Sequence, residues 1–212
     1  TPHREEYFDD KEPYIQSSPD SFGNVRGADV FVVLSLASDE VESINDKFFK
    51  LAMFIGSLKD ASASRVTAVL PYLGYGRQDR KTVSRAPITT KYRARMLESV
   101  GTDRILTLDV HNLAVEQNAF RIPLDNLEAR NIFADYFAEN LPRDKRIVIL
   151  SPDQGGWIRS SLFCNRLAKK LKMEVGMAQL DKIRGANRKA RASTIIGDVK
   201  DCLVIPYDDM IS

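Results

Sequence analysis

A basic, glycine-containing segment spans residues 72–81, where two glycines, a glutamine and an aspartate stand among several arginine and lysine side chains. It follows the apolar run 66–71, which predicts a buried strand, so we expect a loop at a strand end. Glycine lets a ligand approach the backbone closely, and the guanidinium fork pairs with phosphate oxygens. A polyanion is therefore the expected ligand, and a solvated basic loop is the alternative that the basic residues alone would favour.

A histidine ends another predicted strand. His111 follows the apolar run 105–110 and lies two residues after Asp109. A neutral imidazole in such a place could bind a metal ion or a phosphate. A single histidine is more often structural, so both interpretations stay open. The chain has only one other histidine, His3, near its N-terminal end.

Carboxylates follow two further predicted strands. Asp153 lies in the glycine-containing turn 151–156 before a helix, where it could be a metal ligand or an ordinary N-cap. Asp208 and Asp209 follow the apolar run 202–207 and could bind sugar hydroxyls or a metal, or form an exposed turn. Pro206 is unexpected in that strand, because proline donates no hydrogen bond to a central ladder.

Two cations begin a polar stretch. Lys182 and Arg184 head residues 181–191, which we expect to form a long mobile loop. Such cations could close over a reacting phosphate and neutralise charge in the transition state. The alternative is a nucleic-acid patch. No aromatic residue lies between positions 182 and 191, so base stacking is unsupported there.

Strand and helix patterns alternate along the chain, which predicts an α/β fold with mainly parallel sheets. The order is interpreted as two successive lobes, residues 1–124 and 125–212. The apolar run at residues 30–36 predicts a strand that is buried on both faces. The other expected strands are 66–70, 105–110, 146–150, 175–180, 194–197 and 202–207, and the expected helices are 43–57, 88–100, 127–141 and 157–171. In open α/β sheets, ligands bind at the carboxyl ends of strands, where these polar residues fall.

Composition limits the class of protein. The 212 residues carry a net charge of only +2, which does not indicate bulk attraction to nucleic acid or membrane. The two cysteines have no metal-type spacing, which favours a reduced, cytoplasmic setting. We find no signal-peptide pattern and no apolar run long enough to span a bilayer.

Several segments together resemble one family, the ribose-phosphate diphosphokinases, which make phosphoribosyl diphosphate. They occur in the family's order at residues 24–30, 72–81, 84–89, 109–111, 120–127, 151–156, 181–184, 196–199 and 208–211. The resemblance implies two phosphoribosyltransferase-like lobes. It also implies transfer of the diphosphoryl group of ATP to the C1 hydroxyl of ribose 5-phosphate, with Mg²⁺, in nucleotide biosynthesis. The 5-phosphate loop that the family places next is not in the chain, so we expect the second lobe to be incomplete.

The resemblance assigns a role to each candidate residue. Arg77 and Gln78 would bind ATP, and His111 and Asp153 would hold the magnesium–ATP complex. Lys182 and Arg184, with His111, would be catalytic, and Asp208 and Asp209 would bind the ribose hydroxyls. The adenine-contacting segment would contain Phe8, Asp10 and Glu12 and would reach the ATP site of a neighbouring subunit in a dimer or hexamer.

Other classes remain as alternatives. A non-catalytic, synthetase-associated regulatory subunit should lack catalytic cations or metal ligands, yet Arg77, His111, Asp153 and Lys182 are all present. An inactive fragment is compatible with the incomplete second lobe. A salvage phosphoribosyltransferase would lack the loops at 77–79 and 182–184. A nucleic-acid binder is the least supported.

Overall fold

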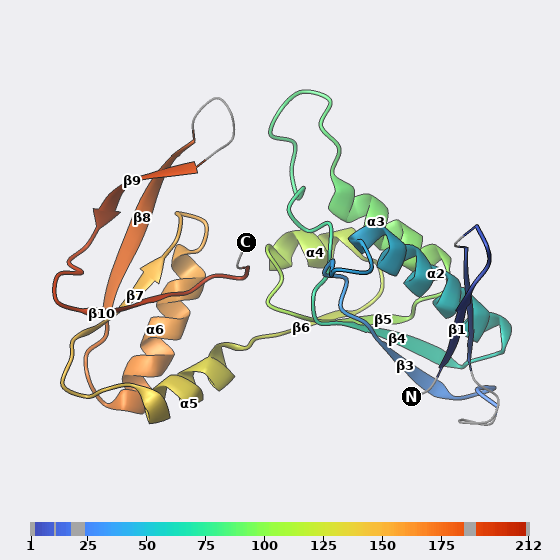
Figure 1. The fold of residues 1–212 in the computed structure, drawn as a ribbon, viewed down its shortest axis with the longest axis horizontal. Helices are drawn as coiled ribbons and strands as arrows, with labels where there is room; N and C mark the ends of the chain where they lie inside the picture. The colour runs from blue at the N-terminus through green and yellow to red at the C-terminus, as the bar shows by residue number, and fades with distance from the viewer. Residues whose placement is uncertain (1–2, 11, 18–23, 185–189, 211–212) are drawn as a thin grey trace. The chain divides into compact units, whose positions relative to one another are not determined.

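A computed structural model describes residues 3–10, 12–17, 24–184 and 190–210. The strands are β1 His3–Tyr7, β2 Pro13–Ser17, β3 Asp29–Val33, β4 Arg65–Leu70, β5 Arg104–Leu108, β6 Leu124–Leu127, β7 Ile147–Ser151, β8 Gly176–Arg184, β9 Ala190–Ile196 and β10 Leu203–Pro206. The helices are α2 Ile44–Asp60, α3 Thr89–Ser99, α4 Leu113–Ala119, α5 Arg130–Asn140 and α6 Trp157–Leu171. They form two compact units, Thr1–Leu127 and Glu128–Ser212 (Figure 1).

The first unit is built on a parallel sheet. Its strand order is β3-β4-β5-β6, and every neighbouring pair is parallel. Helices connect successive strands because parallel pairing needs a crossover. Parallel pairing also brings the carboxyl ends of β4 and β5 to the same edge of the sheet. The predicted α/β class with mainly parallel sheets is confirmed.

One face of this sheet carries the core of the unit. Alternate residues such as Val32, Ala68 and Ile105 pack against apolar side chains of α2 and α3. Figure 1 shows these two helices lying along the sheet. The opposite face exposes Phe31 and Val33, which are 58% and 68% accessible. The expectation that 30–36 is buried on both faces is therefore wrong. The strand alternates, because the core of the described unit lies on one face only.

A hairpin of β1 and β2 lies beside α2 in the first unit (Figure 1). The Tyr7 hydroxyl donates to Glu42 Oε1 at 3.1 Å, and Lys50 pairs with the same carboxylate. Helix α2 begins with a capping box, in which the Ser43 hydroxyl and the Asp46 carboxylate each bond the other residue's backbone amide. The turn end of the hairpin is thus attached to a well-capped helix.

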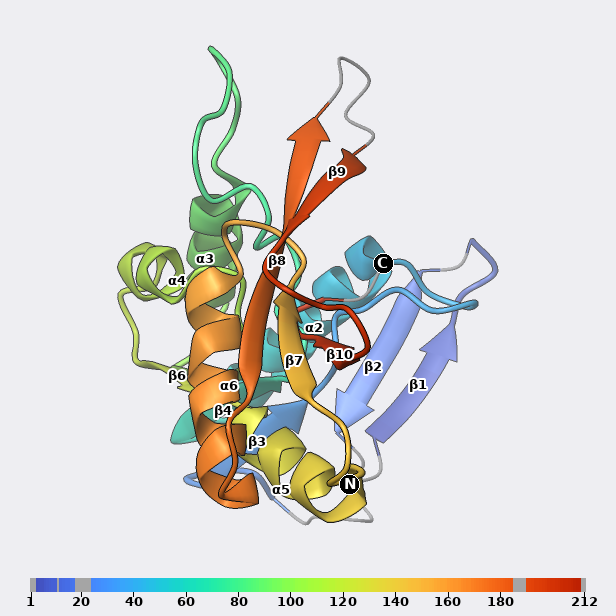
Figure 2. The same ribbon diagram turned by 90° about the vertical axis from the view of Figure 1, so that its left-hand side faces the viewer.

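The second unit has a mixed sheet of order β10-β7-β8-β9. Strand β9 is antiparallel to β8, and the other pairs are parallel. Every residue of β7 is buried, and apolar side chains of α5 and α6 pack in the same core. Figure 2 shows the helix α6 lying against the sheet. Phe163 of α6 stacks on Tyr207 at 4.3 Å between ring centroids, so the segment after β10 is anchored to the helix core.

Several elements differ from the sequence expectations, among them the strand β1. Helix α4 and strand β6 were not predicted, because they are short. The helix has seven residues and the strand has four. β6 pairs with β5 and so belongs to the first unit. The expected loop 181–191 is wrong at both ends, since β8 continues to Arg184 and β9 starts at Ala190. Residues 185–189 lie outside the described part of the chain.

The position of Pro206 has a geometric explanation. β10 lies at the end of the sheet order within the described residues, and amides of Leu203 and Tyr207 donate to β7 at 2.8 and 3.1 Å. Because strand residues alternate in direction, the nitrogen of Pro206 points away from β7. No ladder hydrogen bond to β7 is therefore lost, as is usual for proline on an outer strand.

Two glycines should respond oppositely to substitution by alanine. Gly197 has φ +113°, and an added Cβ would lie 2.9 Å from the Met177 carbonyl oxygen, so Gly197→Ala should cost about 1–3 kcal/mol. Gly56 lies inside α2 with no heavy atom within 4 Å of an added Cβ, so Gly56→Ala should stabilise by about 0.5–1 kcal/mol. Urea unfolding measures both, and two shifts of the same sign would contradict this geometry.

Candidate functional site

Two loops of the first unit meet at the carboxyl edge of its sheet. Residues 72–81 follow β4, and residues 109–112 follow the neighbouring strand β5. They contain Arg77, Gln78 and His111, the residues expected to bind ATP and metal. All three are exposed to solvent, as a binding surface requires.

The loop after β4 is held through its backbone carbonyls. The Thr89 hydroxyl donates to Tyr75 O at 3.2 Å, and the Thr90 hydroxyl donates to Gln78 O at 3.3 Å. These two threonines form the first turn of α3. The start of the helix therefore fixes the loop backbone while the side chains of Arg77 and Gln78 remain accessible.

A buried ion pair lies beneath the loop. Arg93 of α3 pairs with Glu116 of α4, and each side chain is only 2% exposed. Burial lowers the pKa of Arg93 and raises the pKa of Glu116, and their mutual attraction offsets both shifts only in part. The second guanidinium nitrogen of Arg93 donates to the Gly74 carbonyl at 2.6 Å. The pair therefore also holds the loop backbone.

The loop also approaches α4 closely. A Cβ on Gly76 would lie 3.3 Å from Glu116 Oε1, so glycine permits this contact. Asn112 caps α4 by accepting from the Val115 amide at 3.3 Å, and its Nδ2 donates to Asp79 Oδ2 at 2.9 Å. That bond joins the two loops at the residues directly after Gln78 and His111.

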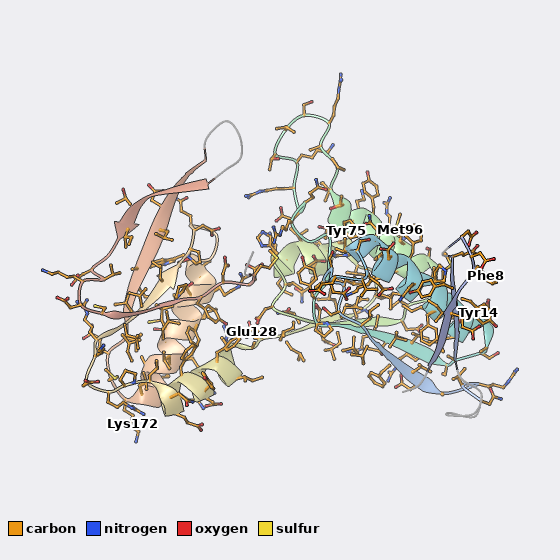
Figure 3. The ribbon with its side chains drawn as sticks, in the orientation of Figure 1. Phe8, Tyr14, Tyr75, Met96, Glu128 and Lys172 are labelled. Carbon is orange, nitrogen blue, oxygen red and sulfur yellow. The ribbon has the colours of Figure 1, made fainter. Side chains whose placement is uncertain are left out.

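The predicted adenine-contacting residues lie at the tip of the β1–β2 hairpin (Figure 3). Phe8 is 56% exposed and meets Tyr14 edge to face, with ring centroids 6.1 Å apart. The Glu12 amide donates to Asp10 Oδ1, and the Phe8 amide donates to the Glu12 carbonyl, both at 3.0 Å. The turn thus presents an exposed aromatic ring beside two carboxylates.

The second unit gathers carboxylates at the carboxyl ends of β7 and β10, which are parallel neighbours. Asp153 Oδ1 accepts from the Gly156 amide at 2.9 Å. A Cβ on Gly156 would lie 3.6 Å from both Asp153 Oδ1 and Asp208 Oδ1. The Asp153 and Asp208 carboxylates therefore both lie close to Gly156, which has no side chain to keep them away.

An arginine that the sequence analysis did not select binds both adjacent aspartates. Arg159 Nη1 lies 3.3 Å from Asp208 Oδ1 and also pairs with Asp209. The Asp209 side chain is 5% exposed, whereas that of Asp208 is 26% exposed. Burial raises the pKa of Asp208, and the neighbouring charges of Asp209 and Asp153 raise it further. Asp208 is therefore the more accessible acceptor of the two.

Lys182 and Arg184 lie in the last residues of β8, where their backbones pair with Ala192 and Ala190 of β9. Their side chains lie outside the described part of the structure. β8 is a parallel neighbour of β7, so it ends at the same edge as the Asp153 turn.

The candidate metal ligands of this chain could bind Mg²⁺ only together with water and phosphate oxygens. Among the described residues, no group of three or more histidine, cysteine, aspartate or glutamate side chains could hold a metal ion. Magnesium commonly keeps several waters and takes one or two carboxylates plus substrate phosphates. Asp153 could supply such a carboxylate in the second unit, and His111 is available in the first.

The structure thus forms two clusters from the predicted residues. Arg77, Gln78 and His111 share an edge of the first unit, and Asp153, Asp208 and Asp209 share an edge of the second. Sequence reasoning missed Arg93, Glu116, Asn112 and Arg159. Arg93 had a usable signal, because it lies at helical spacing from the buried Thr90 and Leu97.

Known proteins resemble this chain in sequence and fold. A family model described as the N-terminal domain of ribose phosphate pyrophosphokinase matches residues 1–101. A ribose-phosphate pyrophosphokinase of Clostridium tetani is 42% identical over 188 residues, which cover 88% of this chain and 55% of that protein. One of Caulobacter vibrioides is 41% identical over 88% of this chain and 57% of that protein.

A solved structure agrees with these sequence matches. The phosphoribosylpyrophosphate synthetase of Mycobacterium smegmatis superposes with a TM-score of 0.80 at 30% identity, covering 98% of this chain and 62% of that one. The fold is therefore that of a phosphoribosylpyrophosphate synthetase. By sequence and fold, the chain is related to the ribose-phosphate pyrophosphokinases, and it spans about 55–57% of the length of these two curated relatives.

No helix in the described part of the chain is both long and apolar enough to cross a membrane.

The convergence of carboxylates in the second unit makes a testable prediction. Asp153→Asn should lower the pKa of Asp208, because it removes a neighbouring negative charge. A folded-state pKa above the ordinary 3.8 favours folding with Asp208 neutral, so that contribution is present below 3.8 and is lost as the pH rises through the raised value. Asp153→Asn should reduce this loss.

Carboxyl ¹³C NMR titration measures the shift directly. Asp198→Asn is the matched control, since Asp198 pairs with Arg146 on the surface. An Asp208 pKa that is equal in the wild type and in Asp153→Asn would contradict the proximity of the two carboxylates.

Proposed function

We propose that this chain carries the ATP-binding and ribose-binding residues of a ribose-phosphate pyrophosphokinase. The reaction transfers the diphosphoryl group of magnesium–ATP to the C1 hydroxyl of ribose 5-phosphate and yields 5-phosphoribosyl 1-diphosphate and AMP. The observation that carries the proposal is that Arg77, Gln78 and His111 share one carboxyl edge of the first parallel sheet. Asp153, Asp208 and Asp209 share the carboxyl edge of the parallel strands β7 and β10. The names of the relatives support the proposal.

The chemistry requires little more than alignment and charge neutralisation. The C1 hydroxyl oxygen attacks the β-phosphorus of ATP, the bond to the α–β bridging oxygen breaks, AMP leaves and the hydroxyl proton is released. Positioning and electrostatic stabilisation dominate such phosphoryl transfers. When bound, Mg²⁺ would neutralise phosphate charge.

Each group of residues has a part in this proposal. Arg77 and Gln78 bind the nucleotide, and His111 and Asp153 hold the magnesium–ATP complex. Lys182 and Arg184 neutralise charge that develops on the phosphates. Asp208 and Asp209 accept hydrogen bonds from the ribose hydroxyls, and the higher exposure of Asp208 suits the closer contact.

The hairpin tip suggests a site shared between subunits. Phe8 offers an exposed ring that a purine could stack on, together with Asp10 and Glu12. The proposal is that this tip contacts adenine bound by a neighbouring subunit of a dimer or hexamer. Light scattering tests the assembly, and a monomer at assay concentration would contradict a shared site.

The nucleotide role of the loop is tested by AMP release from ATP, Mg²⁺ and ribose 5-phosphate. Arg77→Ala should raise KM for ATP by about 10- to 10²-fold, because charged hydrogen bonds are worth about 1.5–3 kcal/mol. Arg95→Ala removes another exposed arginine, on α3, and is the control. Equal KM values for the two variants would refute the assignment.

A chain that binds ATP without releasing AMP would favour the regulatory-subunit or inactive-fragment alternative. A second assay with a full-length relative as partner would then separate those two.

Lys182→Ala should separate binding from turnover. A cation aimed at transition-state charge contributes roughly 10²–10³ in rate, by analogy with oxyanion-hole donors. The variant should therefore bind ATP normally in calorimetry and lose most of kcat. Unchanged kcat would refute a catalytic role for this lysine.

A further inference from the structure

A side-chain hydrogen bond joins the two loops of the first unit. Asn112 Nδ2 donates to Asp79 Oδ2 at 2.9 Å. Asp79 directly follows Gln78, and Asn112 directly follows His111. The Asp79 side chain is only 12% exposed, and its ion contact with Arg80 is long, at 4.0 Å. The short bond to Asn112 is therefore stronger than the contact of this carboxylate with Arg80.

Asn112 is fixed from a second direction. Its side-chain oxygen caps α4 through the Val115 amide, so its amide nitrogen is aimed by the helix start. One residue thus uses both ends of its amide, the oxygen on its own helix and the nitrogen on the other loop. The orientation of the amide is set by this pair of bonds.

We call the Asn112–Asp79 hydrogen bond the tether between the two loops. It rests on the buried Arg93–Glu116 pair. Arg93 donates to the Gly74 carbonyl at 2.6 Å, and Glu116 Oε1 lies against Gly76. Glu116 is one turn along α4 from Asn112, so the partner of Arg93 and the cap that bonds Asp79 belong to the same short helix. The guanidinium carbon of Arg93 also lies 5.5 Å from the Phe120 ring centroid, which is a cation–π distance.

We propose that Asn112, Asp79, Arg93 and Glu116 are positioning residues that hold the Arg77–Gln78 loop in register with His111. The two segments reach the sheet edge from different strands, and the Asn112–Asp79 bond joins them there. This bond holds the two loops together, so nucleotide and metal contacts are presented at a fixed separation. This inference rests on the proposed function for its kinetic consequence, but the tether itself can be tested without it.

Exchange of donor and acceptor tests the tether. Asn112→Asp keeps an N-cap oxygen and the side-chain shape but places two carboxylates together. N112D/D79N restores one hydrogen bond in reversed polarity at the same net charge. We expect amide hydrogen exchange at residues 74–80 to be about 10-fold faster in N112D and to return toward the wild-type rate in N112D/D79N.

Kinetics supply the second readout. N112D should lower kcat/KM for ATP in AMP release by about 10- to 10²-fold, since small misplacements of positioned groups carry penalties of that size. The double variant should recover at least about 10-fold of this loss. If N112D and N112D/D79N are equally impaired, or if N112D exchanges like the wild type, the tether is refuted.

The outcomes separate this inference from the proposed function. A wild-type protein that releases no AMP would count against the function, while the exchange data would still decide the tether. Faster exchange in N112D with rescue in the double variant would support the tether in either case.

The base of the tether is tested by a charge-free replacement. R93M/E116L removes both buried charges at similar volume, which often preserves stability. It also removes the donor to the Gly74 carbonyl. We expect an unfolding midpoint near that of the wild type with exchange at residues 74–80 about 10-fold faster. Wild-type exchange in this variant would overturn the role of the pair.

Discussion

Parallel pairing of β4 with β5, and of β7 with β10 and β8, is the constraint on which the rest of the structure depends. Parallel neighbours end at the same edge, so loops that are tens of residues apart in sequence become adjacent. Strand pairing alone therefore brings the polar residues that follow each strand to one edge, and no interaction between their side chains is needed for this. Side-chain bonds such as that from Asn112 to Asp79 then refine distances that the sheet has already made short.

The groups beneath the first-unit loop show how accessible side chains can be placed accurately. Arg77 and Gln78 are exposed, yet the backbone that carries them is bonded by Thr89, Thr90 and Arg93. A buried ion pair is not in itself a strong source of stability, because desolvation opposes the attraction. Apolar side chains could fill the same volume. They would leave the Gly74 carbonyl without its donor, which suggests that the pair contributes geometry rather than stability.

The sequence predicted the class of fold and the edge at which polar residues gather, because both follow from local patterns. Buried strands such as 66–70 and the helix 157–171 are clear from periodicity. It could not predict that the face carrying Phe31 and Val33 is open, since burial depends on which side the helices pack. It also missed α4, whose seven residues are too few for a periodic signal.

The candidate site was predictable in a similar, partial way. Asp153, Asp208 and Asp209 were found because they follow apolar runs. Arg159 was missed because it lies on a helix face, and its pairing with both aspartates arises only when α6 packs beside β10. The strand pairing at Lys182 and Arg184 was missed because the stretch is polar, and polar strands carry no burial pattern.

Pro206 has a consequence beyond its own strand. Every second backbone amide of β10 points toward β7 and donates a hydrogen bond to it. The amides between them point to the other side of the strand. On that side Val204 has an N–H donor, whereas Pro206 has none. A strand from another copy that docked along this edge would meet a carbonyl without the neighbouring amide, and it would lose one rung of its ladder. Any strand that pairs along this side of β10 must therefore do without one amide donor, so Pro206 limits the ladder that can form there.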